Sequence, residues 1–129
     1  MECWSFPPAY DPDYLPDAGA RYWFPRRETM PAAEREAAIL ERLQQLTRYA
    51  YERAPFYRKK WDQAGFHPEK LKSLEDFDHK VPVITKVDLR EAQARAPLFG
   101  DYLCVPEAEI HHIHGTSGTT GRPTAFGIG

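Results

Sequence analysis

Proline limits where this chain can form regular structure, because its ring fixes φ, removes the backbone donor and restricts the residue before it. Twelve of the 129 residues are proline, above the usual ~5%. Six of these prolines and seven aromatic residues fall within the first 31 residues. Disordered segments are poor in aromatic rings. We therefore expect residues 1–29 to form an extended arm that inserts rings into another surface, with a frayed leader as the alternative.

Residues 30–54 carry the clearest helical pattern. Pro31 suits the first turn of a helix, and Pro55 disfavours helical geometry at the residue before it. Apolar residues recur between them at helical spacing; they are Ala33, Ala37, Leu40, Leu43, Leu46, Tyr49 and Ala50. We expect this face to be packed and the charged opposite face to be solvated.

Three shorter helices follow in the predicted helical region, which covers residues 30–99. The first spans 56–64 and ends at Gly65, which suits a left-handed cap. The other two begin at Ser73 and Thr85, and Asp88 occupies the capping-box position after Thr85. The segment 81–84 is apolar and broken by proline, so we expect a buried connector.

Side chains of the 56–64 helix divide between core and solvent. The rings of Phe56, Tyr57 and Trp61 are spaced to share one face and are expected in the core. The neighbouring basic cluster 58–60 is typical of a solvated helix face.

The last thirty residues change character. Residues 101–105 and 110–114 are candidate strands, and a further strand-like segment ends near Phe126. Between the last two lies a loop rich in Gly, Ser and Thr, residues 115–121. The predicted fold class is therefore an α+β or α/β fragment, with an arm at 1–29, a helical region at 30–99 and a strand–loop–strand region at 100–129.

This glycine–hydroxyl loop carries the most specific chemistry. Its glycines permit close approach of a ligand, and successive backbone N–H groups in such a turn can form an anion nest. Its hydroxyls add hydrogen-bond donors, and Arg122 adds a positive charge beside them. The spacing matches neither the Walker P-loop nor the dinucleotide fingerprint. A flexible linker is the alternative, but linkers rarely place one compact Gly/Ser/Thr block between two strands.

Several functional classes are disfavoured. The formal net charge of −2 gives no support for nucleic-acid binding, and no stretch approaches the ~18 apolar residues of a membrane span. Two distant cysteines and a polar N-terminus fit a soluble, cytoplasmic protein with reduced thiols. Of the three histidines at 111–114, only His112 and His114 would share a strand face, so no metal site is expected.

The segment from His114 to Thr124 resembles the phosphate-binding signature of the adenylate-forming acyl- and aryl-CoA synthetases. Many members end that signature in lysine, whereas Thr124 stands here. The threonine ending and the preceding histidine are similar to phenylacetate–CoA ligases. Residues 51–60, 64–65, 73–77 and 81–90 resemble the N-terminal region of the same ligases, so the likeness spans roughly residues 30–126.

The resemblance implies an ATP-dependent, AMP-forming ligase of aromatic acid catabolism. Such an enzyme joins an aryl carboxylate to ATP, releases pyrophosphate, and passes the acyl group from the adenylate to coenzyme A. It implies ATP, magnesium and coenzyme A as cofactors. It assigns the ATP phosphates to Thr116, Ser117, Gly118, Thr119, Thr120, Gly121 and Arg122, with His114 facing the ligand. No catalytic residue is assigned within the chain.

The resemblance also implies an N-terminal segment of a longer enzyme, because these ligases are several times longer. We expect the 129-residue chain alone to be inactive and to self-associate through exposed apolar surface. The alternative is a small non-catalytic module that binds a partner and keeps the loop as a vestigial anion site.

Overall fold

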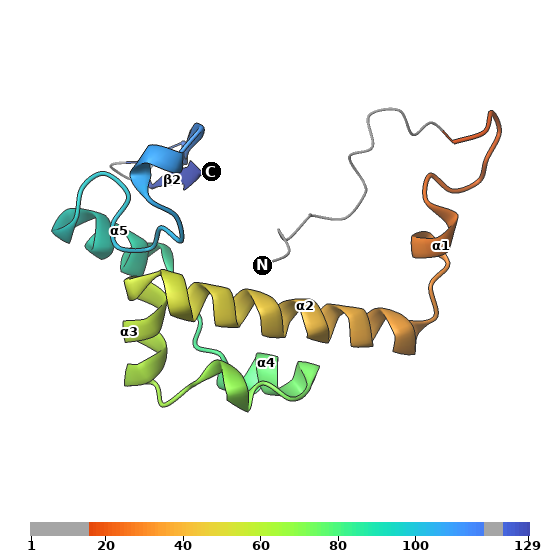
Figure 1. Cartoon of the computed structure of the whole chain (residues 1–129), viewed down its shortest axis with the longest axis horizontal. Coiled ribbons are helices and arrows are strands. Elements are labelled where there is room, and N and C mark those ends of the chain that lie inside the picture. The colour runs from red at the N-terminus through yellow and green to blue at the C-terminus, as the bar shows by residue number, and fades with distance from the viewer. Residues whose placement is uncertain (1–15, 118–122) are drawn as a thin grey trace. The chain divides into compact units, whose positions relative to one another are not determined.

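The computed structural model describes residues 16–117 and 123–129 of the chain (Figure 1). The chain divides into two compact units, Met1–Arg35 and Glu36–Gly129. The described part of the first unit contains the short helix α1 (Pro25–Glu28) and the first four residues of a longer helix that begins at Ala32. Pro25 opens this helix, and the Phe24 backbone N–H donates to Glu28 Oε1 at 2.6 Å. The expected extended arm therefore includes a helical turn, and its residues 1–15 lie outside the described residues.

Helix α2 (Ala32–Arg53) confirms the long helix predicted for residues 30–54. It ends before Pro55, where Ala54 adopts an extended conformation with φ −107° and ψ 112°. Only part of the expected apolar face is packed. Leu40, Leu43 and Ala50 face the core, whereas Leu46 and Tyr49 are 51% and 42% exposed. The position of Thr47 in the buried stripe was not expected; its hydroxyl donates to the Leu43 carbonyl at 2.8 Å.

Helix α3 (Pro55–Gln63) is the second predicted helix, and Gly65 follows it with φ +69°. Trp61 is 4% exposed and packs in one core cluster with Ala50, Phe66 and Leu71. Phe56 is 5% exposed in a second cluster, and the half-buried Tyr57 contacts both clusters. The predicted core role of these aromatic residues is confirmed.

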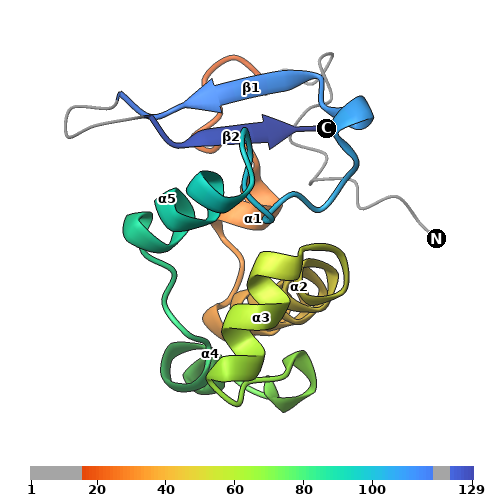
Figure 2. The same cartoon turned by 90° about the vertical axis from the view of Figure 1, so that its left-hand side faces the viewer.

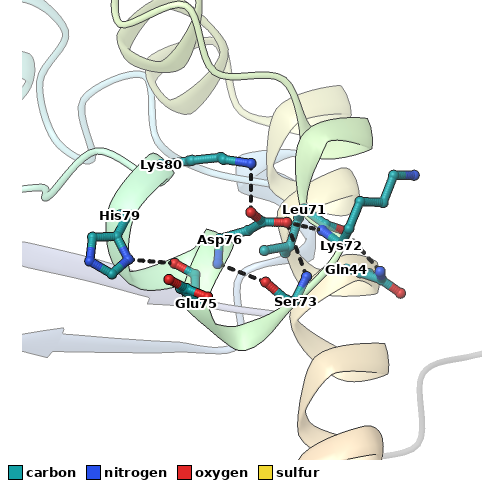
Figure 3. Close-up of polar contacts among 8 residues, drawn as sticks. All are labelled: Gln44, Leu71, Lys72, Ser73, Glu75, Asp76, His79 and Lys80. Carbon is teal, nitrogen blue, oxygen red and sulfur yellow. Dashed lines mark hydrogen bonds and ion pairs between the residues drawn. The ribbon is translucent and has the colours of Figure 1, made fainter.

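Helix α4 (Leu74–Lys80) begins at a capping box, after the short 3-10 helix η2 (Pro68–Lys70). The Asp76 N–H donates to Ser73 Oγ at 3.0 Å, and the Asp76 carboxylate accepts from the Ser73 N–H at 3.1 Å (Figure 3). Gln44 Nε2 of α2 donates to the Leu71 carbonyl at 2.8 Å. This hydrogen bond links α2 to the segment that leads into α4.

Helix α5 (Lys86–Arg95) begins at the capping box predicted from Thr85 and Asp88. Asp88 Oδ2 accepts from the Thr85 N–H at 2.8 Å, while its Oδ1 pairs with Lys60 of α3. Arg58 donates to the Tyr51 and Glu52 carbonyls near the end of α2, at 2.9 and 2.8 Å. Arg58 and Lys59 are exposed, as expected for a solvated face, and Lys60 is half-buried. Arg58 and Lys60 also connect helices.

The strands β1 (His112–Gly115) and β2 (Ala125–Ile128) form an antiparallel hairpin (Figure 2). The predicted strand–loop–strand region is therefore a two-stranded antiparallel sheet. A parallel connection needs a dozen or more residues, and the segment between Gly115 and Ala125 is shorter than that. Residues 101–105 form no strand. Val83 is 82% exposed, so the connector at 81–84 is only partly buried.

We predict that Asp88 makes stability depend on acid pH. Lys60 and the Thr85 groups hold the pKa of Asp88 at about 2, below its ordinary 3.8. A lowered pKa stabilises the folded state above pH ~4 and loses that effect as the pH falls toward 2. The gap in unfolding free energy between the wild type and Asp88→Asn, measured by urea titration, should therefore be constant above pH 5 and narrow below pH 4.

Asp78→Asn is the matched control, because Asp78 is exposed and lies on α4 away from this pair. It removes one negative charge without removing the partner of Lys60, so narrowing seen only with Asp88→Asn is assigned to that pair. A flat profile for Asp88→Asn would contradict the role given to this carboxylate.

Candidate functional site

The hairpin brings the two ends of the glycine–hydroxyl loop together. Gly115 pairs with Ala125 at the end of the sheet. Beyond this pair, the Thr116 N–H donates to the Thr124 carbonyl at 3.0 Å, and the Thr124 N–H donates to Thr116 Oγ1 at 3.0 Å. These two bonds form the neck of the loop, and they fix the backbone from which the loop projects.

The structure describes only part of the predicted phosphate site. Thr116 is half-buried and Ser117 is exposed. The predicted site residues Gly118, Thr119, Thr120, Gly121 and Arg122 lie outside the described residues. His114 is exposed on β1 opposite Phe126.

The hydrogen bond at the neck fixes the role of the Thr116 hydroxyl. Its Oγ1 accepts from the Thr124 N–H, so the hydroxyl hydrogen is left to donate elsewhere. Ser117 presents a second hydroxyl to solvent one residue further on. The described start of the loop therefore offers hydrogen-bond donors, which suit an anion such as a phosphate oxygen.

Thr124 was noted in the sequence only as the ending of the signature. It is 1% exposed, and its Oγ1 has no hydrogen-bond partner among residues 16–117 and 123–129. Its backbone forms both bonds of the neck. Thr124 is therefore a structural part of the site as well as a signature residue.

Tyr102 attaches the hairpin to the helices, a role that the sequence pattern did not indicate. Its hydroxyl donates to the Ala125 carbonyl at 2.5 Å, and its ring centroid lies 6.0 Å from that of Phe126. The ring is buried in a core cluster with Phe56 of α3 and Ala92 of α5. Figure 2 shows α5 beside the hairpin.

The segment after Tyr102 packs along β2. A Cβ added at Gly127 would lie 2.7 Å from Ile110 Cδ1 and 3.2 Å from Leu103 Cδ2. Two apolar side chains thus lie directly on the β2 backbone, and this close approach requires glycine. The hairpin is held at its neck by Tyr102 and further along by Leu103 and Ile110.

The described residues do not assemble a metal centre. No group of three His, Cys, Asp or Glu residues within 16–117 and 123–129 is placed to hold a metal ion. His111, His112 and His114 are all exposed. Cys104 is a free thiol, and burial raises its pKa. No helix in the described part of the chain is long and apolar enough to cross a membrane.

An open pocket of about 560 Å³ next to α3 and α4 is a weaker candidate site. Three basic residues line it, but each already has a partner. Lys70 Nζ donates to the Gly65 carbonyl at 2.6 Å, and Lys80 Nζ pairs with Asp76 at 2.5 Å. The His79 Nδ1 atom lies 2.9 Å from the Glu75 carbonyl oxygen, a contact drawn as a dashed line in Figure 3. The pocket therefore offers an anion little uncompensated charge.

Known proteins resemble this chain along most of its length. No family model matches it. It is 42% identical over 103 residues to a phenylacetate-coenzyme A ligase of Thermus thermophilus, and 41% identical over 100 residues to one of Escherichia coli. These matches cover 80% and 78% of this chain but only 22% of each ligase. The chain therefore spans about a fifth of the length of the curated relatives.

Solved structures give a stronger match. A 2-hydroxyisobutyryl-CoA ligase in complex with 2-HIB-AMP and CoA is 71% identical, with a TM-score of 0.87. The match covers 98% of this chain and 26% of that one. A second structure of the ligase, in the postadenylation state with R3-HIB-AMP, covers 100% of this chain at 67% identity and a TM-score of 0.86.

We predict that Gly100 is required for the seat of Tyr102. Gly100 has φ +65°, and an added Cβ would lie 2.7 Å from Tyr102 Cε1. Gly100→Ala should therefore lower the free energy of unfolding by about 1–3 kcal/mol, from backbone strain and displacement of the ring. Chemical denaturation followed by circular dichroism measures this loss.

Gly65→Ala separates the two causes. Gly65 has φ +69°, but an added Cβ would meet no atom within 4 Å. This variant should show the strain alone and lose less stability than Gly100→Ala. Equal losses would contradict the steric role assigned to Gly100.

Proposed function

The chain is homologous to a segment of the adenylate-forming CoA ligases, and from this premise we propose that it supplies the phosphate-binding hairpin of such an enzyme. The observation that carries the proposal is the likeness to a ligase structure that contains an acyl-adenylate and CoA, over 98% of this chain. The proposed reaction joins a carboxylate to ATP with release of pyrophosphate, and CoA thiol then displaces AMP to form a thioester.

The hairpin's proposed task is to hold the β- and γ-phosphates while pyrophosphate leaves. Charge develops on these oxygens in the transition state, and preorganised donors stabilise it. The hydroxyls of Thr116 and Ser117 would donate to them, together with the loop residues 118–122. The neck between Thr116 and Thr124 holds the donors in place before the substrate arrives. His114, one residue before Gly115, would face the ligand.

The described hairpin residues 112–117 and 123–128 contain no carboxylate, so we propose that magnesium would reach this site bound to the nucleotide phosphates. Mg²⁺ is usually held by one or two carboxylates together with substrate phosphates, rather than by a dedicated protein cage. When bound, it neutralises charge on the phosphate oxygens. The donors described in the hairpin are hydroxyls, which suit the phosphate oxygens that magnesium leaves free.

We also propose that the enzyme is cytoplasmic.

The comparisons suggest two candidate acid substrates. The curated relatives are named for phenylacetate, which agrees with the aryl acid implied by the sequence signature. The ligase of higher identity, 71%, is named for 2-hydroxyisobutyrate. We propose the short hydroxy acid as the preferred substrate, with the aryl acid second. In a full-length ligase containing this segment, ATP–pyrophosphate exchange should be faster with 2-hydroxyisobutyrate; faster exchange with phenylacetate would reverse the order.

We further propose that the 129-residue chain binds nucleotide but does not catalyse the reaction, since it spans about a quarter of the solved ligase. Magnesium-ATP at ten times its Kd should raise the melting temperature by about 5 °C. ATP–pyrophosphate exchange should be absent with either acid. Turnover by the isolated chain would contradict this part of the proposal.

Ser117→Ala tests the hairpin directly. Ser117 is exposed, so its loss should leave the melting temperature without ATP unchanged and reduce the shift that ATP produces. Lys59→Ala is the control, because it removes an exposed cation of α3 and should leave the ATP shift intact. An unchanged melt with ATP, together with a rise on adding a protein partner, would favour the alternative of a non-catalytic module with a vestigial loop.

Exposed apolar residues on the hairpin support the expected self-association. Ile113, Ile128 and Phe126 are 60%, 48% and 37% exposed. Phe126 and Ile128 lie on one face of the hairpin and Ile113 on the other, and we propose that these exposed side chains promote association of the isolated chain. A single monomer mass in light scattering at high concentration would contradict it.

A further inference from the structure

We propose that Tyr102 is a positioning residue that fixes the two ends of the phosphate loop, Thr116 and Thr124, relative to the helical core. The inference rests on the proposed function of the hairpin as a phosphate grip. It concerns a residue that lies outside the loop and that acts through the backbone of Ala125.

The hairpin needs such an anchor because its sheet is minimal. β1 and β2 pair only with each other among the described residues. A two-stranded sheet alone is at best marginally stable in water, so the neck bonds fix the loop relative to the strands but not to the rest of the protein. Groups that bind a reacting phosphate must be held within about 0.5 Å of their working position.

The point of attachment is well placed for this task. Tyr102 donates to the carbonyl of Ala125, which pairs with Gly115 and directly follows Thr124. The hydrogen bond therefore acts one residue from the neck. A shift of the Ala125 carbonyl would carry Thr124 and its partner Thr116 with it.

The Tyr102 ring is itself fixed on several sides. Its centroid lies 5.9 Å from that of Phe56, edge to face, and an alanine of α5, Ala92, is completely buried in the same cluster. The Tyr102 ring packs so closely on the backbone of Gly100 that a Cβ atom at residue 100 would clash with it. The rigid side chain of Tyr102 thus links α3 and α5 to the Ala125 carbonyl.

The protonation state of Tyr102 suits a permanent donor. Burial raises the pKa of its hydroxyl above the ordinary value of 10. The hydroxyl therefore keeps its proton throughout the neutral range, and the anchor does not titrate where a ligase would work.

Tyr102→Phe is the test, because it removes the hydroxyl and keeps the ring in its seat. Amide hydrogen exchange of the chain without nucleotide reports the anchor alone; exchange at the Thr116 and Thr124 amides should become about three- to tenfold faster, the range of one neutral hydrogen bond. At a temperature where both proteins are folded, the Kd for magnesium-ATP should rise by a similar factor, and the amide signal of Ser117 in the ATP-bound state should shift.

Tyr57→Phe is the matched control. Tyr57 is half-buried beside Phe56, and no hydrogen bond links its hydroxyl to the hairpin among the described residues. It should change neither neck exchange nor the Kd. If Tyr102 had a purely structural role, Tyr102→Phe would melt at a lower temperature than the wild type. The ATP-bound amide signal of Ser117 and the Kd for magnesium-ATP would then be the same as in the wild type.

The outcomes separate this inference from the proposed function. If wild-type chain binds magnesium-ATP and Tyr102→Phe binds it equally well with the same bound-state signal, the positioning role is overturned and the phosphate grip stands. If the wild-type hairpin amides do not respond to magnesium-ATP at all, the proposed function is overturned and this inference falls with it. Faster neck exchange together with weaker binding supports both.

Discussion

A continuous line of aromatic rings joins the hairpin to the helical core of the second unit. Neighbouring ring centroids lie 6.0, 5.9, 5.2, 5.4 and 5.5 Å apart. The rings in order are Phe126, Tyr102, Phe56, Tyr57, Trp61 and Phe66. Such pairs add roughly 0.5–1.5 kcal/mol each beyond the area they bury. The two core clusters meet at Tyr57, so this line of rings makes one core of them and extends it to β2.

Charged side chains define the ends of the helices around this core. Asp76 and Asp88 each accept a backbone N–H at the start of their helix and also pair with a lysine. In both cases the hydrogen bond from the lysine is the largest cause of the lowered pKa. At Asp88 one carboxylate thus fixes both where α5 begins and its contact with α3, whereas the Asp76–Lys80 pair lies within α4 itself. The position of the hairpin depends on these helices, because Tyr102 packs against Phe56 of α3 and Ala92 of α5.

Features encoded by neighbouring residues could be predicted from the sequence. Pro55 and Gly65 mark helix ends, and the Thr85–Asp88 spacing gives a cap; all three follow from local geometry. The glycine–hydroxyl loop was likewise found between two strands. Its ligand-binding role stays a prediction, because residues 118–122 lie outside the described residues. The division of the chain into three parts also stays a prediction.

Contacts between distant residues could not be predicted in this way. The Lys60–Asp88 pair spans 28 positions and the Tyr102–Ala125 bond spans 23. A single sequence carries no periodic signal for either. The face of α2 shows the same limit: Leu46 and Tyr49 fit the apolar spacing, yet no element among residues 16–117 and 123–129 buries them. Periodicity identifies a face, whereas the tertiary structure decides how much of it is covered.

We propose that the hairpin binds nucleotide phosphates and that the line of aromatic rings holds it in place. Heteronuclear NMR of the labelled chain during a magnesium-ATP titration tests it most directly. The account predicts saturable amide shifts that concentrate at residues 114–124, with little change at the open pocket around Lys70 and His79. Shifts confined to that pocket, or shifts scattered over surface cations that vanish with added salt, would contradict it.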